Sequence, residues 1–385
     1  MKIAIVLDQL CGMAGSERVA QFVCEEFQEA DVYALVYNAE TTFPYFADRH
    51  IRTTWLNRFA RTPAAFRWSF PLATYLMESL DLRRYDIVLS CSATVAKYIV
   101  NPRGKHICYC YIPTRALWHF DEYFGPSLRS LLVKPLLGYL RKRDYRAAQR
   151  IDKFIAISEV SKSFIERYYN RTADVIHCPV DLAKFHPLPE PRRDHFLLVS
   201  RLEHWKKVEY AIEAFNQLEL PLRVVGSGPE ERRLRAMAKP NVVFVGSVDD
   251  AALAVEYAAA RAVIFTPYLE YGLIPLEANA CGTPVICYGR GGVTETMVPV
   301  HRSGHSETPP TAVFFQEQTA AALMQAVREF DAHQFSEELL TRHAARWSVP
   351  EFQSRIRQAV TDFAQASRVA STARPGDDRL GEKFP

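Results

Sequence analysis

One stretch, Ala262 to Glu295, alternates short apolar runs with glycine and proline in an order that few folds accommodate. Ala262 to Phe265 is a short, wholly apolar run and predicts a buried strand. Leu273 to Cys281 predicts a short helix that Gly282 ends, and Pro284 to Tyr288 predicts a second buried strand. Strands of this kind separated by helices favour a parallel α/β sheet, which binds nucleotides at the carboxyl ends of its strands.

Short apolar runs separated by helical stretches continue along the whole chain and predict two doubly wound α/β domains. A chain of 385 residues is long enough for two domains, each with a core of its own. In the first half we expect strands at 2–8, 31–37, 85–92, 105–112 and 153–158. In the second half we expect them at 195–200, 262–265 and 284–288, with two more that end before Gly226 and at Gly246.

Composition argues against several classes of protein. The formal net charge of +3 is too small to favour a nucleic-acid partner, and 48% hydrophobic with 24% charged residues is ordinary for a soluble protein. The eight cysteines show no zinc-ligand spacing, which favours a reducing cytoplasm. The chain opens on a strand-like run instead of a signal peptide, and no apolar run approaches the roughly 18 residues that span a bilayer.

Two loops are candidates for binding an anion. A loop at 9–16, with Gly12 and Gly15, joins a strand to a helix, which is a common anion cradle, although such loops also simply turn the chain. A second loop carries Arg201 and Lys206 at the carboxyl end of a strand, so both cations can face one diphosphate. The sequence Gly226-x-Gly228 lacks the third glycine of a dinucleotide fingerprint, which argues against an NAD-linked dehydrogenase.

The segment Glu277 to Ile286, EANACGTPVI, resembles the signature of retaining glycosyltransferases of family 4 (group 1), and Gly291, Gly292 and Glu295 match the G-G-x-x-E that follows it. The resemblance implies the GT-B fold, an α/β architecture with two Rossmann-like doubly wound domains facing a central cleft. It also implies transfer of a sugar from a nucleoside-diphosphate donor. The loop at Gly15 is similar to that of a subgroup that builds surface polysaccharides such as lipopolysaccharide and includes mannosyltransferases.

The resemblance also implies the domain boundaries. Residues 1–171 would form the acceptor-side domain and residues 172–347 the domain that binds the nucleotide sugar. A helix at about 348–368 would return to the first domain, and 369–385 is expected to be a disordered tail.

By the same resemblance, Arg201 and Lys206 hold the diphosphate and stabilise it as a leaving group. Glu277 would accept hydrogen bonds from both ribose hydroxyls. The chain has no D-x-D sequence, in keeping with a metal-independent enzyme that needs no cofactor besides its donor. The other donor-binding candidates are Gly15, Gly272, Leu273, Gly291, Gly292 and Val245, and the amides of the glycine pair are expected to help cradle the phosphates.

Two sugar-handling positions depart from the family pattern. The family histidine that faces the donor sugar aligns with Tyr111, and the first glutamate of E-x7-E aligns with Leu269, one residue before Glu270. We therefore include Tyr111 and Glu270 among the catalytic candidates, and our hypothesis is a 6-deoxy hexose donor in place of a GDP-mannose-like one. The alternative is tolerated drift, since in retaining transfer the leaving phosphate itself can accept the proton.

Two basic, aromatic segments, 55–82 and 128–150, fit either of two interpretations. A basic helix with a leucine stripe can lie on an anionic membrane surface, or it can pack on its own sheet with a solvated basic face. A lipid-linked glycan acceptor, common in the family, favours peripheral contact with the inner face of the cytoplasmic membrane.

Two functions from different classes remain open. The preferred one is an active glycosyltransferase, and the alternative is a non-catalytic GT-B subunit that scaffolds another transferase. Because the chain retains Arg201, Lys206 and Glu277, and a decayed enzyme would be expected to lose some of them, the sequence favours activity.

Overall fold

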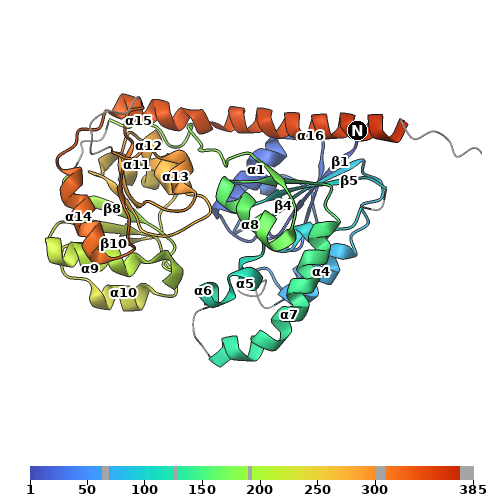
Figure 1. The fold of residues 1–385 in the computed structure, drawn as a ribbon, viewed down its shortest axis with the longest axis horizontal. Helices are drawn as coiled ribbons and strands as arrows, with labels where there is room; N and C mark the ends of the chain where they lie inside the picture. The colour runs from blue at the N-terminus through green and yellow to red at the C-terminus, as the bar shows by residue number, and fades with distance from the viewer. Residues whose placement is uncertain (63–68, 102, 125–127, 190–192, 301–307, 373–385) are drawn as a thin grey trace, which may run out of the picture.

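The computed structural model describes residues 1–62, 69–101, 103–124, 128–189, 193–300 and 308–372. Two parallel sheets with helices packed around them form two α/β domains side by side, so the predicted fold class is confirmed (Figure 1). Residues 63–68 of the predicted basic segment and the tail from 373 lie outside the described residues. No helix in the described ranges is long and apolar enough to cross a membrane.

The first sheet has seven parallel strands in the order β3-β2-β1-β4-β5-β6-β7. Its central strands are buried on both faces, which is why they appear in the sequence as continuous apolar runs. The strands are β1 (Ile3–Leu7), β2 (Asp31–Ala34), β3 (Ile51–Thr53), β4 (Ile87–Ser92), β5 (Lys105–Cys110), β6 (Lys153–Ala156) and β7 (Ala173–Val175). The helices are α1 (Gly15–Glu26), α2 (Pro44–Ala47), α4 (Phe70–Glu78), α5 (Arg115–Trp118), α6 (Phe120–Phe124), α7 (Leu128–Gln149) and α8 (Glu159–Tyr169), with 3-10 turns η1 (Trp55–Arg58) and η2 (Ala96–Tyr98).

The second sheet has six parallel strands in the order β10-β9-β8-β11-β12-β13. The strands are β8 (Phe196–Val199), β9 (Leu222–Val225), β10 (Val242–Gly246), β11 (Val263–Phe265), β12 (Val285–Tyr288) and β13 (Ala312–Phe315). The helices are α9 (Val208–Leu218), α10 (Glu231–Met237), α11 (Asp250–Ala259), α12 (Leu273–Ala280), α13 (Val293–Thr296), α14 (Ala320–Phe330), α15 (Glu337–Ala344) and α16 (Val349–Thr372), with 3-10 turns η3 (His204–Lys206) and η4 (Ala345–Trp347).

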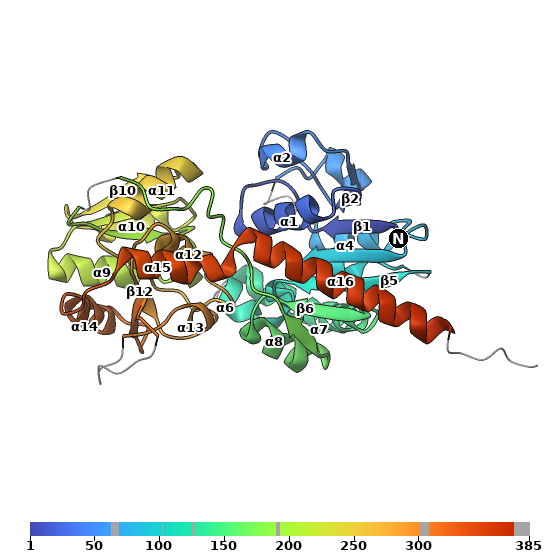
Figure 2. The same ribbon diagram turned by 90° about the horizontal axis from the view of Figure 1, so that it is seen from above.

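The chain crosses between the domains later than the predicted boundary at 171/172. Strand β7 comes after that boundary and pairs with β6 in the first sheet, so the first domain extends through Val175. The chain then returns through α16, which runs along the first domain and is helical as far as Thr372, the last described residue, past the predicted end at about 368 (Figure 2). Buried Phe352 and Ile356 pack α16 onto this domain, and Gln353 Nε2 donates to the carbonyl of Phe22 at 3.1 Å.

The second domain also caps a helix of the first. The Glu295 carboxylate accepts hydrogen bonds from the amides of Glu159 and Val160 at 2.9 and 3.2 Å, at the start of α8. A carboxylate at a helix N-terminus satisfies free N–H groups and complements the helix dipole. Glu295, which matched the G-G-x-x-E sequence, thereby ties α13 to α8 across the interface.

Candidate active site

Arg201 and Lys206 lie on the loop between β8 and α9, at the carboxyl edge of the second sheet. The Arg201 side chain is 63% exposed and pairs with Glu203 at 3.0 Å. The carbonyl of Lys206 accepts a hydrogen bond from Thr266 Oγ1 at 2.9 Å, which ties the loop to the end of β11. Lys207 then adopts a left-handed conformation with φ of 56°, so the chain turns sharply before α9 begins. The loop is thus held against the sheet with both predicted cations on it.

Lys206 has an unusual electrostatic environment. Its ammonium nitrogen lies 4.2 Å from the centre of the Trp205 indole ring. Burial, with the nearby cations of Arg115 and Arg201, lowers the pKa of Lys206 to about 7, although the Glu270 carboxylate opposes the shift. A lysine in this state gains a proton readily when an anion binds beside it, and a strongly shifted pKa is a frequent property of functional groups.

An ion pair between the domains adjoins this loop. Arg115, the first residue of α5, bonds through Nη2 to the carboxylate of Glu270, and its guanidinium lies 4.6 Å from the centre of the Trp205 ring. Glu270, a predicted catalytic residue, is therefore paired with a cation of the other domain. Both residues line a cavity of about 710 Å³ between the domains, together with His119, Trp205 and Tyr268. The sequence analysis did not foresee the roles of Arg115 and Trp205.

The first turn of α1 also contacts the second domain. A Cβ atom on Gly15 would lie 3.2 Å from Leu273 Cδ1, so these two predicted residues meet across the interface. Arg18 pairs with Asp250 of the second domain at 2.5 Å. The glycine loop predicted from the sequence therefore does face the second domain, and Arg18 is a contact that the analysis missed.

Glu277 lies beyond the first turn of α12 and is 9% exposed. Its Oε2 accepts a hydrogen bond from Tyr257 Oη at 2.9 Å. Burial raises the pKa of Glu277, and the Arg18 cation opposes that shift. Among the described residues, no hydrogen bond or ion pair joins Glu277 to Arg201 or Lys206, but Glu277 and Arg201 both lie within electrostatic reach of the first turn of α1.

Tyr111 is not placed as the sequence analysis expected for a sugar-handling side chain. It is 9% exposed, and its hydroxyl donates to the carbonyl of Ser16 at 2.8 Å. The hydroxyl therefore holds the first turn of α1 against β5, and its proton is not available to donate to a ligand.

The predicted amide cradle at Gly291 and Gly292 is wrong for Gly292. Its N–H donates to the carbonyl of Leu269 at 2.9 Å, and a Cβ on it would lie 2.0 Å from the carbonyl oxygen of Glu270. Gly291 has φ of 86°, and a Cβ on it would lie 2.4 Å from the carbonyl oxygen of Leu269. Glycine is required at both positions because the backbone at 291–292 packs directly against the backbone at 269–270. This contact positions the loop that carries Glu270.

The remaining candidates lie in the apolar floor of the same region. Gly272 precedes α12, and a Cβ on it would lie 3.2 Å from Phe265 Cζ at the end of β11. Val245, Leu269 and Leu273 are partly buried and pack against an apolar cluster that includes residues of both domains. Within the described ranges, no group of histidine, cysteine and acidic residues is arranged to hold a metal ion.

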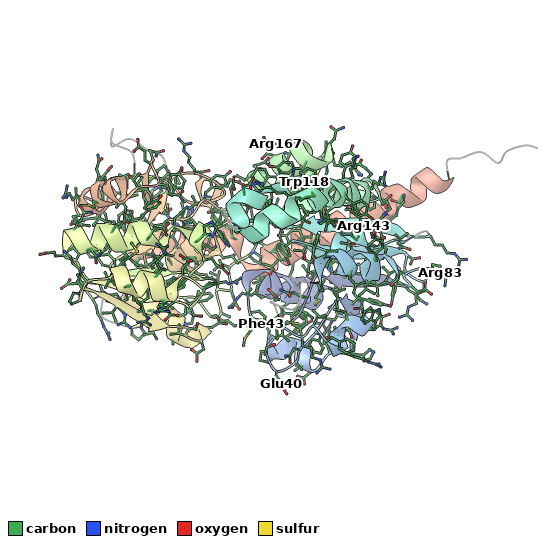
Figure 3. The ribbon with its side chains drawn as sticks, turned by 90° about the horizontal axis from the view of Figure 1, so that it is seen from below. Glu40, Phe43, Arg83, Trp118, Arg143 and Arg167 are labelled. Atoms are coloured by element: carbon green, nitrogen blue, oxygen red, sulfur yellow. The ribbon has the colours of Figure 1, made fainter. Side chains whose placement is uncertain are left out.

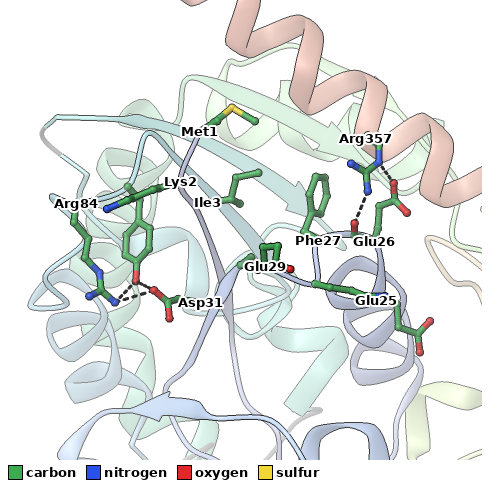
Figure 4. Close-up of a pocket in the computed structure, with 13 residues that line it drawn as sticks. Met1, Lys2, Ile3, Glu25, Glu26, Phe27, Glu29, Asp31, Arg84 and Arg357 are labelled. Carbon is green, nitrogen blue, oxygen red and sulfur yellow. Dashed lines mark hydrogen bonds and ion pairs between the residues drawn. The ribbon is translucent and has the colours of Figure 1, made fainter.

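A hollow of similar size, about 750 Å³, lies at the opposite edge of the first sheet, around the start of β1 and the end of α1 (Figure 4). Its charged groups form pairs with one another. Arg84 pairs with Asp31 at 2.8 Å, and Arg357 of α16 bonds to Glu26. This hollow is therefore a junction of α1, β2 and α16, remote from the interdomain cations.

Two family profiles match adjoining parts of the chain. The profile described as Glycosyltransferase Family 4 matches residues 13–184, and the one described as Glycosyl transferases group 1 matches residues 181–342. Each profile thus corresponds to about one of the two domains.

Several curated proteins are similar to parts of the chain. A D-rhamnosyltransferase of Pseudomonas aeruginosa is 26% identical over 231 residues, which are 55% of this chain and 57% of that protein. Alpha-monoglucosyldiacylglycerol synthase of Streptococcus pneumoniae is 26% identical over 208 residues, 46% of each chain. O-antigen chain mannosyltransferase C of Escherichia coli is 30% identical over 98 residues, 24% of this chain and 26% of that protein. The similarity spans little more than half of the first relative and less of the other two.

Solved structures resemble the chain over nearly its full length. HepE of Anabaena in complex with UDP superposes with a TM-score of 0.68 at 16% identity, covering 94% of this chain and all of the other. Sucrose-phosphate synthase of Thermosynechococcus elongatus gives a TM-score of 0.72 at 18% identity, covering 95% of this chain and all of the other. At such identities the likeness establishes the shared fold.

Proposed function

We propose, from the premise that this chain belongs to the group 1 glycosyltransferases of family 4, that it is an active, retaining transferase that moves a sugar from a nucleoside-diphosphate donor to a glycan. One observation carries the proposal. Lys206, with its pKa lowered to about 7, lies with Arg201 on a loop at the carboxyl edge of the second sheet, and Arg115 of the first domain packs on Trp205 of the same loop. Two cations in such a place are suited to a diphosphate.

The residues of the cleft then have distinct tasks. Arg201 and Lys206 neutralise the diphosphate and stabilise the charge that develops on it as the bond to the sugar breaks. Glu277 accepts the ribose hydroxyls, as its counterpart does in the family pattern. Glu270, oriented by Arg115 and by the backbone of the glycine pair, lies at the sugar end of the cleft. These roles need no metal ion.

The donor proposed here is a nucleotide-linked 6-deoxy hexose. Because the Tyr111 hydroxyl already donates its proton to the carbonyl of Ser16, the side chain offers the sugar its ring and no hydrogen-bond donor, which favours a less polar edge. The similarity to a D-rhamnosyltransferase supports the same class, since rhamnose is a 6-deoxy hexose.

A thermal-shift panel tests donor binding. We expect GDP-, UDP- or dTDP-linked sugars to raise the melting temperature, because a ligand at a hundred times its Kd stabilises the folded state by about 2.7 kcal/mol. Each base is tested with a matched hexose and 6-deoxyhexose pair, and we expect the 6-deoxy member to bind more tightly. A clear preference for the hexose would end the 6-deoxy proposal, and a panel without any response would end the assignment to sugar nucleotides.

Release of nucleoside diphosphate separates the two functional classes. With the best donor and membrane extract as acceptor, a transferase releases nucleoside diphosphate, whereas a non-catalytic scaffold binds the donor and releases none. Donor binding without release of nucleoside diphosphate would therefore favour the non-catalytic scaffolding subunit over the active transferase.

We propose further that the acceptor is lipid-linked and that the first domain contacts the inner face of the cytoplasmic membrane. Leu72 and Tyr75 of α4 and Leu136 and Tyr139 of α7 are exposed, and a hydrogen bond of 2.5 Å joins the two tyrosine hydroxyls. The exposed cations Lys142 and Arg146 belong to the same α7 (Figure 3 views this side of the domain). Aromatic groups beside cations suit an anionic lipid surface.

Part of α7 instead fits the packed-helix interpretation. Arg143 and Arg150 both bond to Glu78, and Arg141 donates to the carbonyl of Leu117 at 2.8 Å. Buried Leu137 and Leu140 belong to an apolar cluster with α5 and α6. The membrane proposal therefore depends on the exposed residues of α4 and α7 alone.

Sedimentation with vesicles tests this surface. The double variant Lys142→Glu/Arg146→Glu is expected to lose most binding to vesicles containing an anionic lipid, since each cation near such a surface contributes about 1 kcal/mol. The matched control is Arg232→Glu/Arg328→Glu, which reverses two exposed cations on α10 and α14 of the second domain. Equal binding by wild type and both variants would contradict the proposal, as would wild-type binding that does not depend on anionic lipid.

A further inference from the structure

A small polar cavity of about 80 Å³ lies at the carboxyl edge of the first sheet, beside the interdomain cleft. It is bounded by the ends of β1 and β4 and by the first turn of α1. Its polar lining comprises Asp8, Gln9, Glu17 and Thr94, and Tyr111 forms one wall. A cavity of this size admits a hydroxyl-bearing arm of a ligand or a few water molecules.

Two of these side chains already have structural partners. The Asp8 carboxylate accepts hydrogen bonds from the four consecutive backbone amides of residues 93–96, at 2.6 to 2.8 Å. Tyr111 donates to the carbonyl of Ser16. The nest of amides after β4, where an anionic group of a ligand would otherwise bind, is thus filled by the protein's own carboxylate. The cavity is therefore unsuited to a phosphate and suited to a neutral group.

Two other polar atoms lack a partner. Gln9 Oε1 and Thr94 Oγ1 are buried, and no described residue hydrogen-bonds to either. A buried polar group without a partner costs free energy, so nearly all such groups in proteins bond to protein, ligand or water. Gln9 Oε1 can accept one hydrogen bond, and the Thr94 hydroxyl can both donate and accept. Together they provide the complement of an alcohol.

Glu17 belongs to the first turn of α1, which borders this cavity and contacts the second domain through Gly15 and Arg18. It is 4% exposed, and Ser16 Oγ donates to its Oε2 at 2.6 Å. Burial raises the pKa of Glu17 and the carboxylate of Asp8 raises it further, whereas the Ser16 hydrogen bond and the Arg201 cation oppose the shift. The influence of Arg201 places the Glu17 carboxyl within electrostatic reach of the cation proposed to bind the diphosphate. The nearby Cys11 thiol has its pKa raised to about 11 by burial and stays neutral.

We propose that this cavity is the subsite for the attacking hydroxyl of the acceptor, with Gln9 and Thr94 binding the alcohol-bearing arm and Glu17 receiving its proton. The inference rests on the transfer reaction proposed above and assigns the acceptor side of the same site. The acceptor oxygen forms the new bond to the anomeric carbon as the bond from that carbon to the diphosphate breaks, and the electron pair leaves with the diphosphate. The proton passes from the acceptor oxygen to Glu17 and then to solvent.

The subsite follows from the contacts of α1. Tyr111 and Arg18 fix the first turn of α1, and Arg18 does so by pairing with Asp250 of the second domain. The proposal places the acceptor hydroxyl on the same side of the sugar as the departing diphosphate. Attack from that side retains the configuration at the anomeric carbon.

The test compares Glu17→Gln with wild type in nucleoside diphosphate release with membrane extract, at the best donor of the panel. The amide keeps the size of the side chain but cannot accept the proton, so we expect kcat to fall at least about 100-fold. The donor-induced thermal shift is expected to remain. In wild type kcat/KM should rise with pH through the pKa of Glu17, and the variant should lose this acid limb. The matched control is Glu25→Gln, the same substitution near the other end of α1, with activity expected as in wild type.

Two results would overturn the subsite. One is full activity of Glu17→Gln with the acid limb intact. The other result concerns Thr94→Val, a variant that keeps the shape of the side chain and removes its hydroxyl. We expect this variant to raise the KM for the acceptor several-fold while the affinity for the donor stays unchanged. An unchanged acceptor KM would contradict the proposal, even if Glu17→Gln fails to fold. A wild type that binds donor and releases no diphosphate, or binds no donor, would instead refute the proposed function, so the two failures are distinguishable.

Discussion

Replacing Lys206 with alanine is expected to slow nucleoside diphosphate release by about 10²- to 10³-fold, the usual loss when one group that stabilises developing charge is removed. The ammonium lies against the Trp205 ring, where burial lowers its pKa to about 7. A bound diphosphate places negative charge beside the Lys206 ammonium, and this charge increases as the bond to the sugar breaks. The cation therefore stabilises the transition state more than it stabilises the free protein. Steady-state release kinetics with the best donor measure the effect.

The sign of the pH dependence provides an independent readout of the same prediction. In the free protein Lys206 loses its proton as the pH rises through about 7, whereas with diphosphate bound it keeps the proton to higher pH. Donor affinity should therefore fall above pH 7, by at most tenfold per pH unit, and binding should take up protons. Calorimetric titrations between pH 6 and 9 test this in wild type, and Lys206→Ala should lose the dependence.

The stability of Lys206→Ala separates a binding role from a structural one. The folded state disfavours the charged form of Lys206, so this group lowers stability increasingly as the pH falls from its unfolded value of 10.5 towards 7. The variant should therefore be no less stable than wild type at pH 7 without ligand. Lys207→Ala is the matched control, one residue along, and should behave as wild type. Release by Lys206→Ala within about threefold of wild type would contradict the assignment of the diphosphate, given the loss expected for such a group.

The fold could be predicted from the sequence because its central strands are short apolar runs flanked by turns. Strands β1, β4, β5, β11 and β12 are buried almost throughout and appear as such in the sequence. Three edge strands were not predicted: β3, β7 and β13. The segment IRT of β3 and the segment ADV of β7 contain charged residues and are only partly buried, so neither forms an apolar run. Strand β7 follows the expected boundary at 171/172 although it pairs with β6 of the first sheet.

The site was predictable where its chemistry is local in sequence. Arg201 and Lys206 belong to one loop, so their spacing alone indicates that they can converge. The pairing of Arg115 with Glu270 joins residues 155 positions apart, and that of Arg18 with Asp250 joins residues 232 positions apart. Such contacts depend on how the two domains pack, which no local pattern encodes.

Two misplaced roles have a different cause. Glycines of a phosphate cradle and glycines required by close backbone contact have the same sequence, so the pair at 291–292 was assigned by resemblance alone. Tyr111 was likewise aligned with a sugar-facing histidine, but a hydroxyl at the end of a longer ring reaches the Ser16 carbonyl, 95 residues away. In both cases the hydrogen-bond partner, which only the folded chain reveals, decides the role.

Replacing Asp144 with alanine is expected to lower the free energy of unfolding by about 3–5 kcal/mol, the usual cost of breaking a buried ion pair from one side. Asp144 and Lys97 are both 0% exposed and lie 3.1 Å apart. The carboxylate also accepts hydrogen bonds from three aromatic side chains and one threonine: Tyr98, Tyr169, Trp118 and Thr114. Without it, an unpaired ammonium and several donors would stay buried. Urea unfolding measures the loss, and Asp81→Ala, which breaks an exposed pair with Arg83, should change stability little.

The double variant Asp144→Leu/Lys97→Met shows whether the loss comes from the stranded charge. If it does, the double variant should be more stable than Asp144→Ala, because neither charge is then left alone in the interior. Equal instability of the two would instead mean that the hydrogen bonds to the aromatic side chains dominate. The network also reaches the proposed site, because Thr114 directly precedes Arg115 and Trp118 ends the same helix, α5. Loosening it should therefore disturb the pairing of Arg115 with Glu270, and the double variant should lose catalytic activity even where it regains stability.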